Sequence, residues 1–263
     1  MGSRLPFEEA SETLGHFGLS ISTAELARLL EQYGTDAEQH VKKSLLKLEL
    51  FPLEAPQGKS GRVMVFQADG VYVLGRESSQ ATQGCGIEIK TALIYPQSAP
   101  QQRTRVASVC TAGEFLPLCS GLLRQADVQL QDTLVAVTDG APWLASLCET
   151  MGVHQHILDV YHSSSYLETV MLALGWEDER RDEEHRTWVK GQWSGRDWLK
   201  THLPEEMNPG WSPQAKIAVS YLKNRVHLMD YPRYVEQEFP IGSGQIEGMN
   251  KQVIGGRMKG SGM

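Results

Sequence analysis

Three acidic residues stand in sequence contexts that suit metal binding: Asp69, Asp139 and Glu247. Asp69 occurs in QADG and Asp139 in VTDG, and each follows an apolar stretch that predicts a β-strand. Glu247 occurs in PIGSGQIEGMN, where Ser243 or Gly244 can begin a helix that carries the glutamate on its first turns. The gap between the second acid and the third is longer than the gap between the first and the second. Carboxylate oxygens are ligands that Mg²⁺ prefers.

A pair of Mg²⁺ ions held by carboxylates can cleave or join phosphodiester bonds. Ions roughly 3.5–4 Å apart activate the attacking water or 3'-hydroxyl on one side and stabilise the leaving oxygen on the other. Mg²⁺ retains several waters, so three protein carboxylates suffice, and Mn²⁺ can take its place. Two aspartates that meet at the ends of neighbouring strands would repel each other unless a cation lay between them.

Each acid also has a simpler explanation. Asp-Gly is a preferred pair in two-residue hairpin turns, and Asp69 between VMVFQA and VYVLG fits such a turn. Glu247 and Lys251 are one helical turn apart, which fits an exposed ion pair worth about a few tenths of a kcal/mol. For any one acid alone we favour the simpler explanation. Their joint position favours a ligand site, because Asp69 belongs to the first strand of an α/β unit and Asp139 ends a buried strand.

The net charge of the chain limits how it could bind nucleic acid. With 263 residues and a formal net charge of −7, the surface as a whole is not that of a protein that tracks phosphates. Binding to DNA would have to be local. The residues after Glu247 include Lys251, Arg257 and Lys259 and contain neither Asp nor Glu, so this short basic segment is the candidate DNA contact.

The remaining composition indicates a globular protein without a membrane anchor. The apolar runs are far shorter than the roughly 20 residues that a membrane-spanning helix needs, and the N-terminus does not resemble a secretion signal. We therefore expect a cytoplasmic protein. The four cysteines form no CxxC pair, so we expect packed, reduced thiols.

The segment 1–61 predicts a helical region and a linker. Between Ser20 and Leu50 we expect a hairpin of two helices, with Thr23 as the first cap, a break at YGTD, and Asp36 as the second cap. A helix-turn-helix DNA reader is the less favoured alternative, because the second helix offers few basic residues. The Pro- and Gly-containing segment 51–61 predicts a linker and a domain boundary.

Residues 62–263 predict an α/β domain with a helical insertion. Strands are expected at 62–75 and 86–95, in RVASVCTA, at Leu134 to Val137 and around Ile157, with a helix near residues 115–126. This order of strands and helices is typical of α/β proteins. The segment of about 163–236 has helical character only, and Trp176, Trp188, Trp193 and Trp198 are expected to form the core of a small helical subdomain.

Three blocks of sequence carry a resemblance to a known family. They are VFQADGVYV, then LVAVTDGAPWL with ILDVYHSSSYL, then YPRYVEQEFPIGSGQIEGMNKQVIGGRMKGSGM. With them the chain resembles the DDE transposases of bacterial insertion sequences, in particular the Kra-type family, whose members carry DGA-W, D-YH and PIGSG-(I/V)E with R-KGSGM. The resemblance covers roughly residues 62–263, and the C-terminal block is its most specific part.

The resemblance implies an RNase H-like fold, with a mixed sheet flanked by helices, and metal-dependent cleavage and strand transfer at the ends of an insertion sequence. The implied triad is Asp69, Asp139 and Glu247, which would hold two Mg²⁺ ions. Implied partners are transposon-end and target DNA, with a homodimer or higher oligomer assembled on DNA. The longer second gap between the acids fits family members that carry a helical insertion before the glutamate.

Residues next to the triad receive supporting roles. Asp159 and His162 match the D-YH motif, and we expect them, with Asn250, to support the ligands or to face DNA. Helix capping is an equal alternative for Asp159 and His162. Lys251 would contact phosphate beside Glu247.

Two other functions stay open from the sequence. One is an RNase H-like nuclease that uses the same acids without strand transfer. The other is a non-catalytic DNA-binding or regulatory fragment, since relatives continue beyond the GSGM at which this sequence stops and a truncated copy would have lost its activity.

Overall fold

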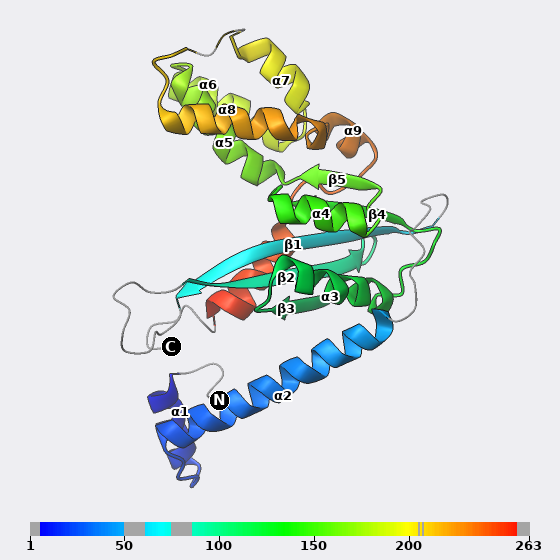
Figure 1. Ribbon diagram of the computed structural model, residues 1–263. Coiled ribbons are helices and arrows are strands. Elements are labelled where there is room, and N and C mark those ends of the chain that lie inside the picture. Colours follow the sequence, from blue (N-terminus) through cyan, green and yellow to red (C-terminus); the bar gives the residue numbers. More distant parts are fainter. Residues whose placement is uncertain (1–5, 50–60, 75–85, 205, 207, 257–263) are drawn as a thin grey trace.

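A five-stranded mixed sheet forms the centre of the protein, with the strand order β3-β2-β1-β4-β5 (Figure 1). The computed structural model describes residues 6–49, 61–74, 86–204, 206 and 208–256. β1 pairs with β4, and β4 with β5, in parallel, whereas β2 is antiparallel to both of its neighbours. Helices cover both faces, so the expected α/β class with a mixed sheet flanked by helices is confirmed. The strands are β1 (Val63–Leu74), β2 (Gly86–Pro96), β3 (Thr104–Ser108), β4 (Thr133–Thr138) and β5 (Gln155–Leu158).

The first strand continues far beyond the end of its parallel neighbour. β1 pairs with β4 only as far as Gln67, but it pairs with β2 along nearly its whole length, to Leu74. Asp69 lies opposite Thr91 inside this ladder. The hairpin-turn explanation for Asp69 is therefore wrong, because the backbone runs straight through the Asp-Gly pair.

One face of the sheet is covered by α3 (Ala112–Gln125) and α4 (Pro142–Thr150). α3 begins with a capping box, in which Thr111 and Glu114 satisfy each other's backbone N–H groups. The apolar residues of β1 and β4 that point to this face, such as Phe66 and Leu134, are fully buried against Phe115 and its neighbours. Burial of this kind stabilises the sheet by about 25 cal/mol per Å² of apolar surface.

The opposite face packs against α10 (Gly244–Met249), and α5 (Val160–Ala173), which follows β5, packs on α6 (Asp178–Val189) and α8 (Pro213–Arg225) of the insertion. Val65, Val137 and Ile157 point to this face and share one apolar core with Ile246 of α10. α10 thus lies behind the sheet in the view of Figure 1, next to β1 and β2. Segments that are far apart in the sequence therefore meet on this face.

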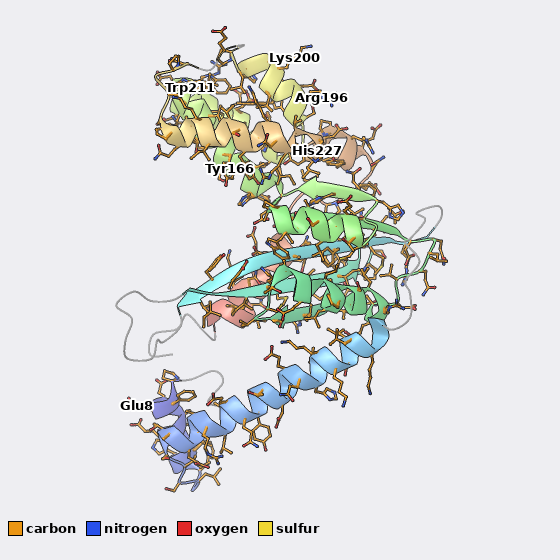
Figure 2. All side chains as sticks on the ribbon, viewed as in Figure 1. Glu8, Tyr166, Arg196, Lys200, Trp211 and His227 are labelled. Atoms are coloured by element: carbon orange, nitrogen blue, oxygen red, sulfur yellow. The ribbon has the colours of Figure 1, made fainter. Side chains whose placement is uncertain are left out.

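The region predicted as a helical insertion contains helices only among the residues that the structure describes there. Trp188 and Trp198 are fully buried in its core, and Trp176 and Trp193 pack against them, as predicted. Trp211, just before α8, lies at the opposite end of the molecule from Glu8 of α1 (Figure 2). The helices after α5 are α6 (Asp178–Val189), α7 (Gly195–His202), α8 (Pro213–Arg225) and α9 (Tyr231–Glu236), with a 3-10 turn η1 (Val226–Leu228).

The N-terminal helices differ from the prediction. The hairpin consists of α1 (Phe7–His16), which the sequence pattern did not predict, and α2 (Thr23–Glu49), a continuous helix. The expected break at YGTD and the cap at Asp36 are wrong, because Gly34 costs a helix only about 1 kcal/mol and Leu45 packs directly on Gly121 of α3. Ser22, not Thr23, accepts the first-turn N–H, from Glu25.

Two sequence predictions, the linker and the free cysteines, fall partly outside the residues that the structure describes. The predicted linker lies outside the described residues except for Gly61, whose N–H donates to the Gln131 carbonyl at 2.8 Å. Cys110, Cys119 and Cys148 are free thiols, and burial raises the pKa of Cys119 and Cys148; Cys85 lies outside the described residues. Among the described helices, none has the length and apolar character to cross a membrane.

Candidate active site

Three aspartates stand at the same level of the sheet, Asp69 within β1 and Asp139 and Asp159 directly after β4 and β5. Gln67 pairs with Val137, so two residues further along Asp69 and Asp139 stand at the same level. Thr138 pairs with Leu158, which places Asp159 at that level on the next strand. Parallel strands are about 4.8 Å apart and alternate residues share a face, so the acids point to the same side of the sheet as Val137.

The carboxyl group of Asp69 is half-buried and lies within the electrostatic reach of Asp139. Its pKa is raised, first because burial disfavours the charged form and second because the negative charge of Asp139 opposes ionisation. Hydrogen bonds from the Gly70 N–H at 2.7 Å and from Asn250 Nδ2 at 2.8 Å partly offset this shift. An ionised Asp69 beside Asp139 is therefore a place that a cation would stabilise.

Asp139 lies in a tight turn that directly follows β4. Its Oδ1 accepts the N–H of Ala141 at 2.8 Å, and Gly140 has a φ of +73°, in the left-handed region that favours glycine. Two side chains of α8 contact the backbone of this turn. Tyr221 donates its hydroxyl to the Asp139 carbonyl at 2.5 Å, and Arg225 donates Nε to the Gly140 carbonyl at 2.8 Å.

Asp159 is buried and its carboxylate bonds to backbone groups. Oδ1 accepts the N–H of His162, which makes Asp159 the N-cap of α5, and Oδ2 accepts the N–H of Ser243, each at 2.5 Å. The capping alternative therefore describes this residue. Because Ser243 is the residue that precedes α10, the same carboxylate also fixes the start of the helix that carries Glu247.

A second contact fixes α10 on the sheet. Gln67 is fully buried on β1, where Oε1 accepts the N–H of Ile246 at 3.0 Å and Nε2 donates to the Gly242 carbonyl at 3.2 Å. Sequence reasoning missed this residue. A polar side chain in an apolar strand, two residues before Asp69 and on its face, was the available signal.

Glu247 lies on α10 as predicted, and it is exposed. It lines one cavity of about 360 Å³ together with Asp69 and Asp139. The simple ion-pair explanation for Glu247 is not supported, since no salt bridge within the described residues joins it to Lys251, which is exposed on the next turn. The cavity is lined by Ala68, Asp69, Asp139, Asp159, Tyr161, His162, Ser165, Ser243, Ile246 and Glu247.

Asn250 begins the π-helical segment η2 (Asn250–Gly255) that follows α10. Such π-helical turns are rare and occur often at functional sites. Asn250 is buried and donates Nδ2 to Asp69, while its Oδ1 has no hydrogen-bond partner in the part of the chain that the structure describes. Lys251 follows on the exposed side, and the predicted contacts Arg257 and Lys259 lie outside the described residues.

His162 lies on the first turn of α5 and lines the acid cavity. Its ring lies beside two tyrosine rings, with centroid distances of 5.5 Å to Tyr166 and 5.9 Å to Tyr221. The tyrosines stack on each other at 3.7 Å with their planes 6° apart. This aromatic group joins the acid cavity to α8 of the helical insertion.

The residues around the cavity fit Mg²⁺ in ligand type and in space. Within the described part of the chain, no group of three or more His, Cys, Asp or Glu side chains is already arranged to hold an ion. Mg²⁺ needs no such cage, since one or two carboxylates usually hold it while waters and substrate phosphates complete its shell. A cavity of about 360 Å³ has room for ions with several waters, each of about 30 Å³. The Oδ1 of Asn250 is a further oxygen next to Asp69.

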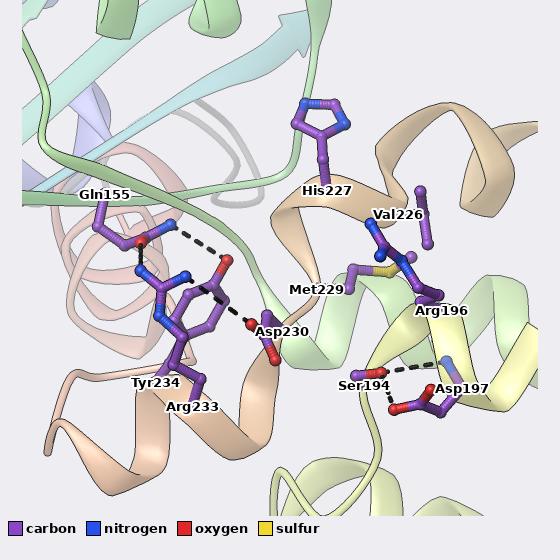
Figure 3. Close-up of a pocket in the computed structure, with 10 residues that line it drawn as sticks. All are labelled: Gln155, Ser194, Arg196, Asp197, Val226, His227, Met229, Asp230, Arg233 and Tyr234. Atoms are coloured by element: carbon purple, nitrogen blue, oxygen red, sulfur yellow. Dashed lines mark hydrogen bonds and ion pairs between the residues drawn. The ribbon is translucent and has the colours of Figure 1, made fainter.

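A larger cavity, of about 460 Å³, lies at the start of β5, away from the acids (Figure 3). Two arginines, Arg196 and Arg233, share it with two aspartates, Asp197 and Asp230, so these charges balance. Arg233 also donates to Gln155 Oε1 at 3.3 Å. None of the predicted site residues lines this cavity, and the smaller cavity remains the candidate site.

No protein-family model matches the chain. A search of curated proteins likewise finds no match.

Proposed function

We propose that the chain has an RNase H-like fold and is the catalytic part of a DDE-type DNA transposase. The observation that carries the proposal is the meeting of Asp69, Asp139 and Glu247 at one cavity, although the three acids are far apart in the sequence. The expected mixed sheet flanked by helices is compatible with this fold. The sequence resemblance supplies the reaction class.

The three acids and Asn250 have distinct roles in this proposal. When bound, two Mg²⁺ ions would activate the attacking oxygen and stabilise the leaving oxygen. Asp69 on β1 and Asp139 in the turn after β4 would hold the ions, and Asn250 would orient Asp69 through its Nδ2 hydrogen bond. Glu247 lies on a helix rather than a strand and closes the site from the exposed side.

DNA is the proposed partner, as transposon ends and as target. Contacts would be local, because the chain carries a net charge of −7 and phosphate binding requires cations. We propose that Lys251, which is exposed one turn beyond Glu247, contacts a phosphate next to the acids. We assign Arg257 and Lys259 to the same DNA contact, and we propose that the active species is a dimer or higher oligomer on DNA.

Strand transfer with Asp139→Asn tests the proposal. The purified protein, with Mg²⁺ or Mn²⁺, is incubated with a labelled plasmid that carries the DNA flanking its own coding sequence. We expect joined products from the wild type and none from Asp139→Asn, because the substitution removes a charged group that would hold the ions. Asp230→Asn, an equally conservative change in the other cavity, is the control. Joining by Asp139→Asn at the wild-type rate contradicts the assignment.

A nuclease that acts on structured DNA or RNA is the second candidate, since the same acids support cleavage without joining. The labelled products distinguish the two functions: cleaved strands with no joined product favour the nuclease. A non-catalytic DNA-binding or regulatory protein is the third candidate. It predicts that calorimetric titration detects no carboxylate-dependent Mn²⁺ binding near the millimolar range.

A further inference from the structure

The turn that carries Asp139 is held from outside the sheet by the helical insertion. Tyr221 and Arg225 of α8 donate to the carbonyls of the two turn residues, Asp139 at 2.5 Å and Gly140 at 2.8 Å. These carbonyls follow the last residue of β4 and have left the strand ladder. Without α8, two partly buried carbonyl groups beside the acid cavity would lose these partners.

Both side chains of α8 are themselves fixed in place. The ring of Tyr221 stacks on Tyr166 of α5 at 3.7 Å, and the Arg225 guanidinium lies 3.9 Å from the centre of the Tyr221 ring. Arg225 suits this position, because its planar guanidinium can stack on a ring while one N–H remains directed at a carbonyl.

The turn has room for Arg225 because residue 140 is a glycine. At Gly140 a Cβ atom would lie 2.8 Å from Arg225 Nε and 2.7 Å from Leu158 Cδ1, closer than real Cβ contacts. Arg225 therefore approaches a backbone that only glycine leaves open. The carboxylate of Asp139 is tied to the same turn, since its Oδ1 accepts the N–H of Ala141 at 2.8 Å.

We propose that Tyr221 and Arg225 are positioning residues that set the direction of the Asp139 carboxylate, so that the helical insertion completes the ion site. This inference rests on the proposed metal-binding role of Asp139. The helical insertion then contributes to the structure of the proposed metal site and is not only attached to the sheet. Residues that orient metal ligands in this way typically change metal affinity about 10- to 100-fold when they are replaced.

Mn²⁺ binding by the full chain, followed by calorimetry and by electron paramagnetic resonance, tests the proposal. Tyr221→Phe keeps the ring stack and removes the hydroxyl, and we expect it to weaken Mn²⁺ binding about tenfold. Tyr234→Phe is the matched control, because Tyr234 is a buried tyrosine of the same insertion whose hydroxyl bonds Gln155 at 3.1 Å, away from the acids. We expect the control to bind Mn²⁺ as the wild type does.

A second background separates positioning from a general loss of stability. In an Asp139→Asn protein, the added Tyr221→Phe change should have no further effect on the residual Mn²⁺ affinity, because the group through which it acts is gone. Wild-type Mn²⁺ affinity in Tyr221→Phe, with Asp139→Asn still impaired, would overturn the positioning role alone. Unchanged binding in Asp139→Asn itself would overturn the proposed function and this inference with it.

Discussion

Gly140→Ala is expected to destabilise the protein more than an alanine at another left-handed glycine. Gly140 and Gly175 both have a φ of +73°, but only Gly140 is crowded. An alanine side chain in the left-handed region costs roughly 1–2 kcal/mol, offset by about 0.4–1 kcal/mol from the less flexible unfolded chain. Gly175→Ala should therefore lose about 1 kcal/mol.

The contacts at Gly140 add a second cost. A Cβ there meets Leu158 Cδ1 at 2.7 Å and Arg225 Nε at 2.8 Å, so side chains must move in a packed region, which typically costs about 1–3 kcal/mol. We expect Gly140→Ala to lose about 2 kcal/mol more than Gly175→Ala. For a chain of this size, that difference lowers Tm by about 4–8 °C more.

Urea and thermal denaturation of the two variants, side by side, measure this difference, and Mn²⁺ titration measures its effect on the acids. Metal affinity should fall in Gly140→Ala and remain in Gly175→Ala. Equal losses of stability in the two variants would refute the reasoning, because they would mean that Arg225 and Leu158 give way without cost.

Three further predictions concern the acids and their supports. Asp159→Asn replaces a carboxylate that accepts two backbone N–H groups, so we expect a loss of about 2–3 kcal/mol in urea denaturation, whereas a loss below about 0.5 kcal/mol would contradict its capping role. Asp69→Asn should raise the Tm of the metal-free protein at pH 7, because the pKa of Asp69 is raised in the folded state and its ionised form therefore destabilises the fold. The same substitution should abolish the stabilisation of the protein by Mg²⁺. The gain should vanish as pH falls towards the ordinary carboxyl pKa, and a gain that persists at acid pH would point to another cause. Gln67→Leu, which leaves the Gly242 carbonyl without its side-chain partner, should cost about 2 kcal/mol and increase hydrogen exchange in α10; unchanged exchange would exclude the assigned contact.

The positions of the strands could be predicted from the sequence because apolar and β-branched residues identify them locally. Val63–Leu74 and Thr133–Thr138 both appear where Val-rich segments predicted them. Whether Asp69 lies in a turn or within a strand could not be predicted, since an Asp-Gly pair is equally suited to a hairpin turn. The pairing of β1 with β2 keeps Asp69 within a strand, and that pairing depends on the sheet as a whole.

The acids of the candidate site were identifiable from the sequence, and so was Asn250, which donates to Asp69, but two other supports, Gln67 and Tyr221, were not. Gln67 and Tyr221 act on backbone groups of residues that are distant in the sequence, and no local pattern indicates such contacts. The break expected at Gly34 was wrong for a related reason. Packing of α2 on α3 outweighs the small preference of one glycine against helix.

The unequal lengths of β1 and β4 give the two sides of the acid cavity different stiffness. Asp69 lies on a strand whose backbone remains bonded to β2 well beyond the end of β4, so this wall resists displacement. Glu247 instead lies on a short helix that continues into a π-helical turn and is fastened through a few side-chain contacts. In the proposed function, a DNA phosphate that binds at the cavity would therefore be accommodated by a shift of Glu247, while Asp69 keeps its place on the sheet.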